Sequence, residues 1–457
     1  MRADPVGVAR KSTGHRRRRS ALLALAVAGL LVAALAGSSA ASSSSGAPLA
    51  SYSKAASHRK VFRKLLRSLR RSVRPRPNLR PLSDAAPKPR PAPSAASNGR
   101  ERFGVSPDNL EFEGEATRNR TLDSLAAMGA RWIRFDVKWD VIQHDGPDSF
   151  DFSRYDALAA AATARGFRIL GTLAYAPRWA RSEACKDSFP CEPRDAGEYA
   201  RFAEATVAHF RGRIGHWEIW NEPNISGFWR PKPNAAAYTA LLKAAYPRIK
   251  AANPEAVVLA GATSPAPDDG TQIDEVTFLE QVYAAGGGGS FDAWSHHPYT
   301  HPAPPGNVHP DSAWYQIYGT KPNIRDVMRS HGDAAKQVWG TEYGAPTAGT
   351  PGSVSEATQA QWVTQAYNLW KSYDWAGPLF WYADRDQLPT GASEDAWNYY
   401  GLLREDFSPK PAWSAYRAAA PSRVATPAAS PAAGRRGRRR ASSPAGAAAS
   451  RRTRRRR

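Results

Sequence analysis

The sequence predicts an α/β protein, a (β/α)8 barrel with disordered basic extensions at both ends. Between residues 101 and 420, apolar runs of strand character alternate eight times with amphipathic runs of helical spacing. Eight such units in about 320 residues average about 40 residues each, as this barrel requires. A doubly wound open sheet would also alternate, but no glycine-rich phosphate loop follows the first strand. The barrel is therefore the favoured architecture.

The individual elements follow from periodicity and from turn residues. Strands are expected over residues 103–106, 131–139, 168–175, 216–221, 256–263, 292–297, 337–343 and 377–383. Helices are expected over residues 117–128, 154–165, 196–211, 235–252, 275–284, 313–331 and 356–372, with a closing helix at 409–420. Because active sites of such barrels lie at the C-terminal ends of the strands, the residues there are the candidates for function.

The charge of the chain is divided unevenly. Of the 63 Lys and Arg, 33 lie in residues 1–100 and 421–457, which contain only two of the 41 Asp and Glu. The remaining 30 basic and 39 acidic residues give the region 101–420 a net charge of −9, so the formal +22 belongs to the ends. A basic chain often binds nucleic acid. Neither end contains a recognisable nucleic-acid module, so we expect no sequence-specific nucleic-acid binding.

Residues 1–41 resemble an export signal or an N-terminal anchor. Four arginines at residues 16–19 precede an apolar run over residues 21–36, and small residues follow it. Sixteen apolar residues are fewer than the about 20 that a spanning helix needs, which favours a cleaved signal and leaves an uncleaved anchor open. In both cases the barrel is expected outside the cytoplasm, secreted or at the cell surface.

The cysteine content agrees with an extracytoplasmic location. Cys185 and Cys191 are the only two cysteines, and the pair is predicted to form a loop disulfide. The alternative is a pair of metal ligands. No nearby His or Cys pair completes a tetrahedral set, so the disulfide is preferred.

The two extensions, residues 42–100 and 421–457, are predicted to be disordered, because Ala, Ser, Pro and Arg supply too little apolar surface to offset the entropy of ordering. Between residues 54 and 74, apolar residues recur at helical spacing among Arg and Lys. This segment fits a basic amphipathic helix on an anionic surface or, equally, a solvated spacer. The Arg-rich C-terminal segment could bind an anionic cell-wall polymer or membrane surface by charge.

Two glutamates end strands of the predicted barrel. Glu222, in the motif Trp-Asn-Glu-Pro at residues 220–223, follows the fourth strand, and Glu342 ends the seventh. The two carboxyls can therefore face each other across the mouth of the barrel. Two carboxyls that face each other in this way, one protonated and one ionised, can carry out acid–base and nucleophilic chemistry on a glycosidic bond.

The same mouth collects aromatic and polar side chains that suit a sugar, whose C–H faces stack on rings while its hydroxyls form hydrogen bonds. These side chains are Arg134, Asp136, Tyr175, Trp179, Asn221, His297, Tyr299 and Trp381. Taken singly, most of the fifteen tryptophans are more simply explained as core.

Other polar residues near the mouth have simpler explanations. Glu218 lies four residues before Glu222 and is expected to be a hydrogen-bonded carboxylate inside the barrel. Asp136 is expected to pair with Arg134, and Asp384 with Arg385, although contact with substrate is the alternative for both. His296 and His301 flank His297 but lack a carboxylate ligand at matching spacing, so no metal site is expected.

Several of these segments resemble the clan A retaining glycoside hydrolases, family 39 above all, with family 5 as a neighbour. The matching segments are residues 134–139, 175–179, 218–223, 297–299 and 340–342. The resemblance covers about residues 101–420. Many family 39 enzymes carry an additional β-sandwich, for which no room is expected after residue 420, so substrate analogies within that family are not carried over.

The resemblance implies a retaining β-glycosidase in which Glu222 is the general acid/base and Glu342 the nucleophile. The charge of Glu342 would raise the pKa of Glu222, whereas Arg134 and Tyr299 would keep Glu342 ionised. Asn221 would hold a sugar 2-hydroxyl and His297 would orient the nucleophile or the substrate. The substrate-binding residues would be Arg134, Trp179, Asn221, His297, Tyr299 and Trp381, with Trp381 as the floor of the site.

The implied enzyme is a monomer that acts on a β-linked poly- or oligosaccharide without metal or organic cofactor. Two alternatives stay open. One is a catalytically idle carbohydrate-binding barrel tethered to the cell envelope by the basic ends, against which the presence of both glutamates argues. The other is a polyanion-binding surface protein whose barrel is incidental.

Overall fold

The computed structural model describes residues 100–350 and 352–420. The predicted signal or anchor at residues 1–41, the linker up to residue 99 and the C-terminal segment 421–457 lie outside the described residues. Within the described part of the chain, no helix combines the length and the apolar character needed to cross a membrane.

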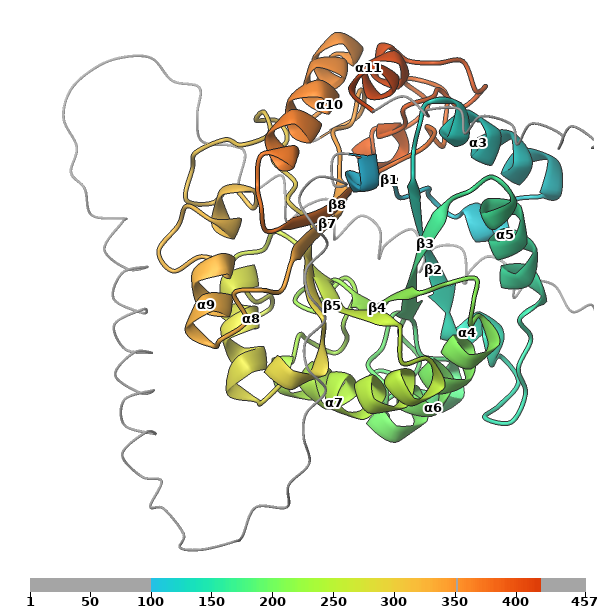
Figure 1. The fold of residues 1–457 in the computed structure, drawn as a ribbon, viewed down its shortest axis with the longest axis vertical. Helices are drawn as coiled ribbons and strands as arrows, with labels where there is room; N and C mark the ends of the chain where they lie inside the picture. The colour runs from blue at the N-terminus through green and yellow to red at the C-terminus, as the bar shows by residue number, and fades with distance from the viewer. Residues whose placement is uncertain (1–99, 351, 421–457) are drawn as a thin grey trace, which may run out of the picture.

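Eight parallel strands close into a barrel at the centre of the molecule, in sequence order around the barrel (Figure 1). They are β1 (Phe103–Val105), β2 (Trp132–Lys138), β3 (Arg168–Ala174), β4 (His216–Asn221), β5 (Val257–Thr263), β6 (Ala293–His296), β7 (Val338–Tyr343) and β8 (Ala376–Trp381). The barrel closes where β1 pairs with β8, with Gly104 opposite Phe380. Each strand lies within two residues of its predicted bounds, so the predicted fold class is confirmed.

Helices surround the barrel and cover the outer faces of the strands (Figure 1). They are α3 (Glu115–Ala127), α4 (Trp139–Ile142), α5 (Ser153–Ala164), α6 (Ala196–His209), α7 (Ala235–Ala252), α8 (Glu275–Ala284), α9 (Ile324–Ser330), α10 (Glu356–Lys371) and α11 (Pro411–Ala419). Five of them begin after a side chain that accepts a hydrogen bond from a backbone N–H of the first turn, which satisfies a donor left unpaired there. These N-caps are Asp195, Asn234, Asp274, Asn323 and Ser355.

One predicted helix is wrong as a single element. The segment 313–331 contains a short 3-10 turn, Tyr315–Ile317, and then α9, which begins only at Ile324. Pro322 lies between them and has no backbone N–H with which to continue a helix. Asn323 then caps the new helix, because its Oδ1 accepts a hydrogen bond from the N–H of Asp326 at 2.7 Å.

An apolar layer fills the barrel interior at the N-terminal ends of the strands. It consists of Trp132, Leu170, Leu259, Ala293, Trp339 and Phe380. The rings of Trp132 and Trp339 meet edge to face with centroids 5.2 Å apart. Because side chains alternate along a strand, Arg134 and Asp136 share the inward face of β2 with Trp132. Polar residues therefore begin directly above an apolar floor, towards the C-terminal mouth.

The loop between β3 and α6 contains the predicted disulfide, Cys185–Cys191. The guanidinium of Arg181 donates to the carbonyl oxygens of Lys186 and Ser188 in the same loop. The disulfide prediction is therefore confirmed.

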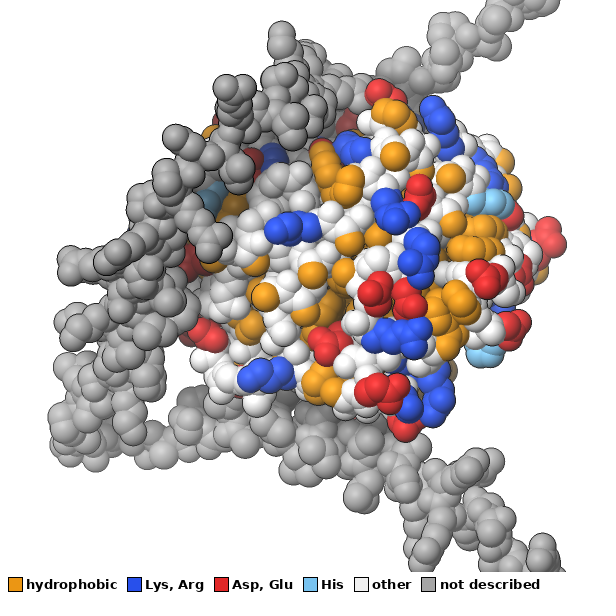
Figure 2. Space-filling view, turned by 90° about the horizontal axis from the view of Figure 1, so that it is seen from below, with side chains coloured by type: hydrophobic (Ala, Val, Ile, Leu, Met, Phe, Trp, Pro, Cys, Tyr) orange, Lys and Arg blue, Asp and Glu red, His pale blue; other side chains and the backbone are white. Residues whose placement is uncertain are grey.

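The charges of the barrel surface are mixed. On the face shown in Figure 2, the acidic and basic side chains of the described residues lie interspersed with apolar ones and form no broad area of one sign. This distribution agrees with a folded region whose net charge is only slightly negative.

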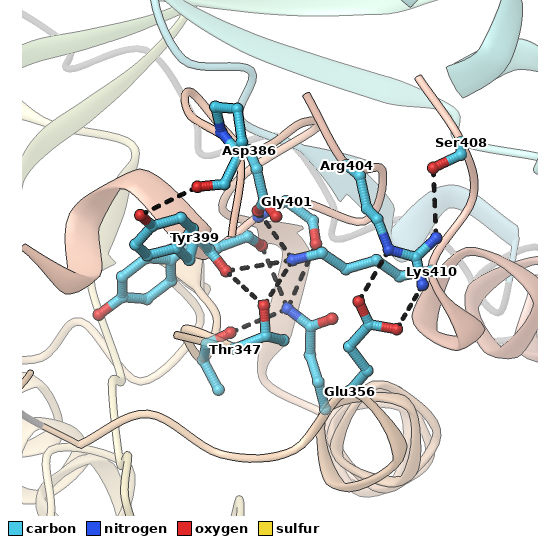
Figure 3. A network of polar contacts seen from close by, with 12 residues as sticks. Thr347, Glu356, Asp386, Tyr399, Gly401, Arg404, Ser408 and Lys410 are labelled. Carbon is cyan, nitrogen blue, oxygen red and sulfur yellow. Dashed lines mark hydrogen bonds and ion pairs between the residues drawn. The ribbon is translucent and has the colours of Figure 1, made fainter. Parts of the chain in front are cut away.

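A buried polar network fixes the long loop between β8 and α11 (Figure 3). The Nζ of Lys410 donates to Oδ1 of Asp386 at 2.8 Å, to Oγ1 of Thr347 at 2.7 Å and to the carbonyl of Tyr399 at 3.3 Å. Lys410 and Asp386 are each only 1% exposed. The ion pair thus ties this loop to the loop after β7 at the rim of the barrel.

We expect the substitution Lys410→Met to destabilise the protein by about 3–5 kcal/mol, because it leaves the Asp386 carboxylate buried without its cation. Urea unfolding would measure the change. The matched control is Lys186→Met, which removes an exposed ion pair with Glu183 and should leave the midpoint nearly unchanged. The double variant Lys410→Met with Asp386→Leu should recover part of the loss. Equal unfolding midpoints for Lys410→Met and the control would contradict the role of the Lys410–Asp386 pair in stabilising the fold.

Candidate active site

The backbone at the end of β4 departs from regular strand geometry. In a regular strand, Asn221 would lie on the opposite face from Glu218. Trp220 and Glu222 instead have φ values of 69° and 45°, in the left-handed region that residues other than glycine rarely adopt. Each such residue costs on the order of 1–3 kcal/mol. The result is that Glu218 and Asn221 both contact one arginine of β2.

Trp220 is held in this conformation by its surroundings. Its side chain is completely buried, and its Nε1 donates to the carbonyl of Phe228 at 2.8 Å. Its ring packs against the rings of Tyr175 and Trp229, with centroids 5.5 and 5.2 Å away. These contacts compensate for the strained backbone that directs Asn221 and Glu222 towards the mouth of the barrel.

Arg134 is the centre of the polar site. Its Nε donates to Glu218 at 2.8 Å, its Nη1 to Glu342 at 2.6 Å and its Nη2 to Asn221 at 2.6 Å. Burial alone would lower the pKa of Arg134, but the negative charges of Glu218 and Glu342 raise it above its usual value. One buried cation therefore joins side chains from β2, β4 and β7.

The hydrogen bond from Arg134 also orients the amide of Asn221. A guanidinium can only donate, so the atom it meets is the amide oxygen, Oδ1. The Nδ2 group of Asn221 is then left without a protein partner among the described residues. Because Asn221 lines the pocket, this N–H2 group is available to a ligand hydroxyl.

Glu342, at the end of β7, is held by two donors. Besides Arg134, the hydroxyl of Tyr299 donates to its Oε2 at 2.9 Å. Burial raises the pKa of Glu342, while a protonated His297 and the Arg134 cation act in the opposite direction and the hydrogen bond from Tyr299 does so more weakly. The predicted contacts of Arg134 and Tyr299 with Glu342 are thus present.

Glu222 lies beside Glu342 in a different environment. Its Oε1 is 2.8 Å from Nδ1 of His297. Burial raises the pKa of Glu222 to about 7, and a hydrogen bond with Ser264 and the charge of Arg134 only partly offset this effect. The sequence analysis attributed such a shift to the charge of Glu342. The structure corrects that attribution, because burial is the main cause.

His297 was expected to orient the nucleophile or the substrate, and the structure places it against both carboxyls. Its Nδ1 lies 3.6 Å from Oε2 of Glu342, beyond hydrogen-bond distance and farther than from Glu222. Burial lowers the pKa of His297 to about 4, so its ring is neutral at pH 7. A neutral imidazole holds Glu222 in place without stabilising its ionised form as a cation would.

Glu222 and Glu342 are close enough to act on one atom. One ligand atom from each of Glu222, His297 and Glu342 lies within 4.8 Å of the others. Three such atoms could also bind a metal ion, but the Arg134 guanidinium already supplies a cation to Glu342. An inverting glycosidase needs carboxyls about 6.5–9.5 Å apart, and a retaining one needs about 5–5.5 Å. The closest oxygens of Glu222 and Glu342, within 4.8 Å of each other, are compatible with the retaining spacing.

A pocket of about 430 Å³ opens above these residues. Of the predicted residues, those lining it are Arg134, Asp136, Tyr175, Asn221, Glu222 and Glu342. Trp381 does not line it. Its side chain is completely buried, and its Nε1 donates to the carbonyl of Tyr400 at 3.2 Å. Trp179 lies outside this lining too, with its Nε1 bonded to the carbonyl of Gln143 and its ring against Trp139.

The aromatic residues that line the pocket from the β8 side are Tyr382 and Trp397. The sequence analysis missed both. Tyr382 directly follows β8, so its place at the end of a barrel strand was a usable signal. Trp397 lies in an irregular loop with no periodicity, and nothing in the sequence distinguishes it from the other tryptophans.

Two predicted ion pairs are wrong. The donors of Arg134 are directed to Glu218, Asn221 and Glu342, and Asp136 makes no hydrogen bond or close ion pair with any described residue. Arg385 pairs with Glu113 at 2.7 Å instead of with Asp384. Asp384 accepts a hydrogen bond from the backbone N–H of Asp108, and burial raises its pKa to about 7.

The half of the pocket next to β1 and β2 is acidic. Asp108, Glu111 and Asp136 line it, and Nζ of Lys138 lies 3.1 Å from Oε1 of Glu111. Burial raises the pKa of Asp108 and of Asp136, although Lys138 opposes this effect in both. Carboxyl groups in such a wall can hold hydroxyl groups, whereas a negatively charged ligand would be repelled.

Comparison with known proteins supports the fold. No protein-family model and no curated protein matches the chain. Among solved structures, a family 39 glycoside hydrolase from Bacteroides cellulosilyticus WH2 is similar at 23% identity with a TM-score of 0.56, over 70% of this chain and 64% of that protein. A monomeric β-xylosidase from Caulobacter crescentus CB15 is similar at 21% identity with a TM-score of 0.53, over 70% of this chain and 68% of that protein.

A family 39 enzyme from Xanthomonas axonopodis pv. citri shows the same likeness, with 20% identity, a TM-score of 0.53, and coverage of 70% of this chain and 65% of that protein. The chain thus spans slightly less than two thirds of the Bacteroides and Xanthomonas proteins. At these identities the likeness establishes the fold. The barrel is the one found in the family that the sequence motifs resemble.

We expect the Glu222 carboxyl to titrate near pH 7, well above its ordinary value of 4.5, because burial disfavours its charged form. Infrared difference spectra of protein labelled with ¹³C-glutamate, recorded between pH 4 and 9, would follow its protonated C=O band. Burial also raises the pKa of Glu111 to about 7, so the Glu222 component is the part of the band that is lost in Glu222→Gln. The whole band should persist in the control Glu183→Gln, which changes an exposed carboxyl. A Glu222 midpoint near 4.5 would contradict the argument from burial.

Proposed function

We propose that the barrel is a retaining β-glycosidase that hydrolyses the O-glycosidic bonds of a β-linked oligo- or polysaccharide. The observation that carries the proposal is the pair Glu222 and Glu342, which have one oxygen each within 4.8 Å of the other and lie in environments of different charge. Glu342 faces the cation Arg134 and a tyrosine hydroxyl, whereas Glu222 faces a neutral histidine. Two carboxyls distinguished in this way can take the roles of nucleophile and acid.

In the first step, Glu342 attacks the anomeric carbon while Glu222 gives its proton to the leaving oxygen. The C–O bond of the glycoside breaks as the bond between Glu342 and the sugar forms. In the second step, Glu222 takes a proton from water, which attacks the same carbon and releases Glu342. Asn221, which lines the pocket and whose Nδ2 group has no partner among the described residues, would donate a hydrogen bond to a sugar hydroxyl and so fix the orientation of the ring.

The pocket chemistry favours a neutral sugar. The acidic wall of Asp108, Glu111 and Asp136 can accept hydrogen bonds from hydroxyls and repels a uronic acid. The Caulobacter relative is a β-xylosidase by its name, so β-xylosides belong among the first compounds to be tested. Tyr382 would supply the apolar surface on which the sugar ring in this pocket stacks.

The location and partners of the protein are also part of the proposal. The export-type segment at residues 1–41 and the loop disulfide support an extracytoplasmic enzyme, secreted or held at the cell surface. The basic ends would then retain it on an anionic cell-wall polymer or membrane by charge, which predicts a strong dependence of retention on salt.

The substitution Glu342→Gln is expected to reduce kcat/KM at least about 10³-fold, equivalent to about 4 kcal/mol of transition-state stabilisation, because it removes the nucleophile. The purified protein would be incubated with a panel of β-linked glycans and aryl β-glycosides, and products would be followed by mass. Glu183→Gln, an exposed change, is the control. If the folded parent binds a glycan but cleaves none, the proposal of an enzyme is wrong and the protein is a carbohydrate-binding barrel.

Stereochemistry tests the roles of the two carboxyls. With azide as an added nucleophile, Glu342→Gly should form the α-glycosyl azide, because azide then attacks the face that the glutamate occupied. Glu222→Ala should form the β-glycosyl azide, because azide attacks the covalent intermediate. The reverse assignment of products would exchange the roles of the two residues.

The pH dependence follows from the pKa of Glu222. As pH rises through about 7, Glu222 loses the proton that it must donate, so kcat/KM should fall about tenfold per pH unit. Towards acid, kcat/KM should fall again as Glu342 becomes protonated. In Glu222→Ala, assayed on an aryl glycoside that leaves without protonation, the alkaline limb should disappear. Its persistence there would assign that limb to another group.

A further inference from the structure

A second pocket adjoins the catalytic one. Its volume is about 380 Å³, and the loops after β5 and β6 supply most of its wall. Ser264 and Trp397 line both pockets, so the two form neighbouring compartments of one cleft. Thr300, Asn307 and Asp311 add polar groups to the wall of the second pocket.

Trp397 is unusually exposed for a tryptophan, at 54% of its surface. One face of its indole is supported, because the ring stacks on Tyr400 with centroids 5.1 Å apart and planes 16° from parallel. Tyr299 and Tyr382 meet the indole edge-on at 6.2 and 6.1 Å. A rigidly supported aromatic surface left open to solvent at a cleft is a typical binding surface for a flat apolar face.

The backbone beneath Trp397 is also fixed. The carboxylate of Asp395 accepts a hydrogen bond from the N–H of Trp397 at 3.0 Å. The buried Lys410–Asp386 pair holds the same loop through the carbonyl of Tyr399 (Figure 3). The indole is thus positioned before a ligand arrives, which reduces the entropy lost on binding.

The second pocket lies on the acid side of the catalytic pair. Glu222 faces the strands whose loops build the second pocket, because its N–H donates to the carbonyl of Ala262 in β5 at 2.9 Å and its Oε1 lies 2.8 Å from Nδ1 of His297 after β6. Glu342 meets Arg134 of β2 at 2.6 Å and has the hydroxyl of Tyr299 as its hydrogen-bond partner from the β6 side. The carboxyl that protonates the leaving oxygen must face the leaving group. The acidic wall of Asp108 and Asp136 lines the first pocket and is absent from the lining described for the second.

We propose that Trp397 is the stacking platform for the leaving sugar and that the second pocket is its binding site, so the preferred substrates are oligosaccharides rather than glycosides of small alcohols. This inference rests on the proposed function and specifies on which side of the cleaved bond Trp397 contacts the substrate. Trp397 is then a specificity residue that contacts substrate but takes no part in bond making.

The test compares Trp397→Ala with the parent on two probes, a methyl β-monoglycoside and β-linked oligosaccharides of the same sugar with two to five units. The loss of kcat/KM on oligosaccharides should be about tenfold or more, which corresponds to about 1.4 kcal/mol. The loss on the methyl β-monoglycoside should be less than about twofold, since its methyl group leaves the second pocket without a ring to stack on Trp397. Trp397→Phe should restore most of the oligosaccharide activity.

Two controls keep the result interpretable. Phe150→Ala removes another exposed ring, which stacks on Phe152 and lines neither pocket, and it should change neither activity. Thermal unfolding of each variant checks that the fold is intact. Activity of the parent on a 4-nitrophenyl β-monoglycoside tests the proposed function separately, so a failure of that function would be seen without any variant.

Transfer of the sugar to added oligosaccharide acceptors provides a second measurement. Acceptors occupy the leaving-sugar site during the second step, so Trp397→Ala should lower the ratio of transfer to hydrolysis about tenfold or more, by the same loss of stacking. Equal losses on the monoglycoside and the oligosaccharides would overturn the proposal. A loss in the release of methanol from the methyl β-glycoside of the disaccharide would also overturn it, because that reaction puts no sugar in the leaving-sugar site and would place Trp397 on the other side of the cleaved bond.

Discussion

The guanidinium of Arg134 is the interaction on which the site depends. It contacts Glu218 and Asn221 from β4 and Glu342 from β7, so one side chain sets the relative positions of three strands. Each buried ion loses several kcal/mol of solvation, which only close partners can offset. The Arg134 guanidinium therefore serves both the fold and the site. The same positive charge stabilises the polar interior of the barrel and faces the candidate nucleophile Glu342.

The two candidate catalytic carboxyls differ in their neighbours more than in their burial. Burial raises the pKa of both. At Glu342, Arg134 and the hydroxyl of Tyr299 oppose this rise in pKa, because both stabilise the ionised carboxylate. Glu222 has a neutral His297 at its side instead. An arrangement of this kind assigns an acid and a nucleophile from identical side chains. The strained backbone at Trp220 and Glu222 is consistent with a site whose geometry is maintained at the expense of stability.

The sequence predicted the parts of this protein that follow a period or a topological rule. Strand positions, the disulfide and the meeting of Glu222 with Glu342 all derive from alternation, spacing and the shared mouth of a barrel. Trp397 could not be predicted, because its place depends on how the loop after β8 folds back over the rim. Trp381 was expected at the pocket from its strand, yet Tyr382, one residue later, lines it. A shift of one residue at a strand end decides which ring faces the pocket.

The ion pair of Lys410 and Asp386 explains why an irregular loop can present Trp397 reproducibly. Replacing a buried ion pair with apolar residues is often neutral or stabilising, so stability alone is a weak reason for this pair. The other partners of Lys410 and Asp386 indicate what the pair does. Lys410 reaches Thr347 after β7 and the carbonyl of Tyr399, while Asp386 receives the backbone N–H of Gly401. Apolar side chains would fill the same space but could not form these hydrogen bonds with the two loops. The pair therefore specifies one loop conformation, and with it the aromatic rim of the pocket.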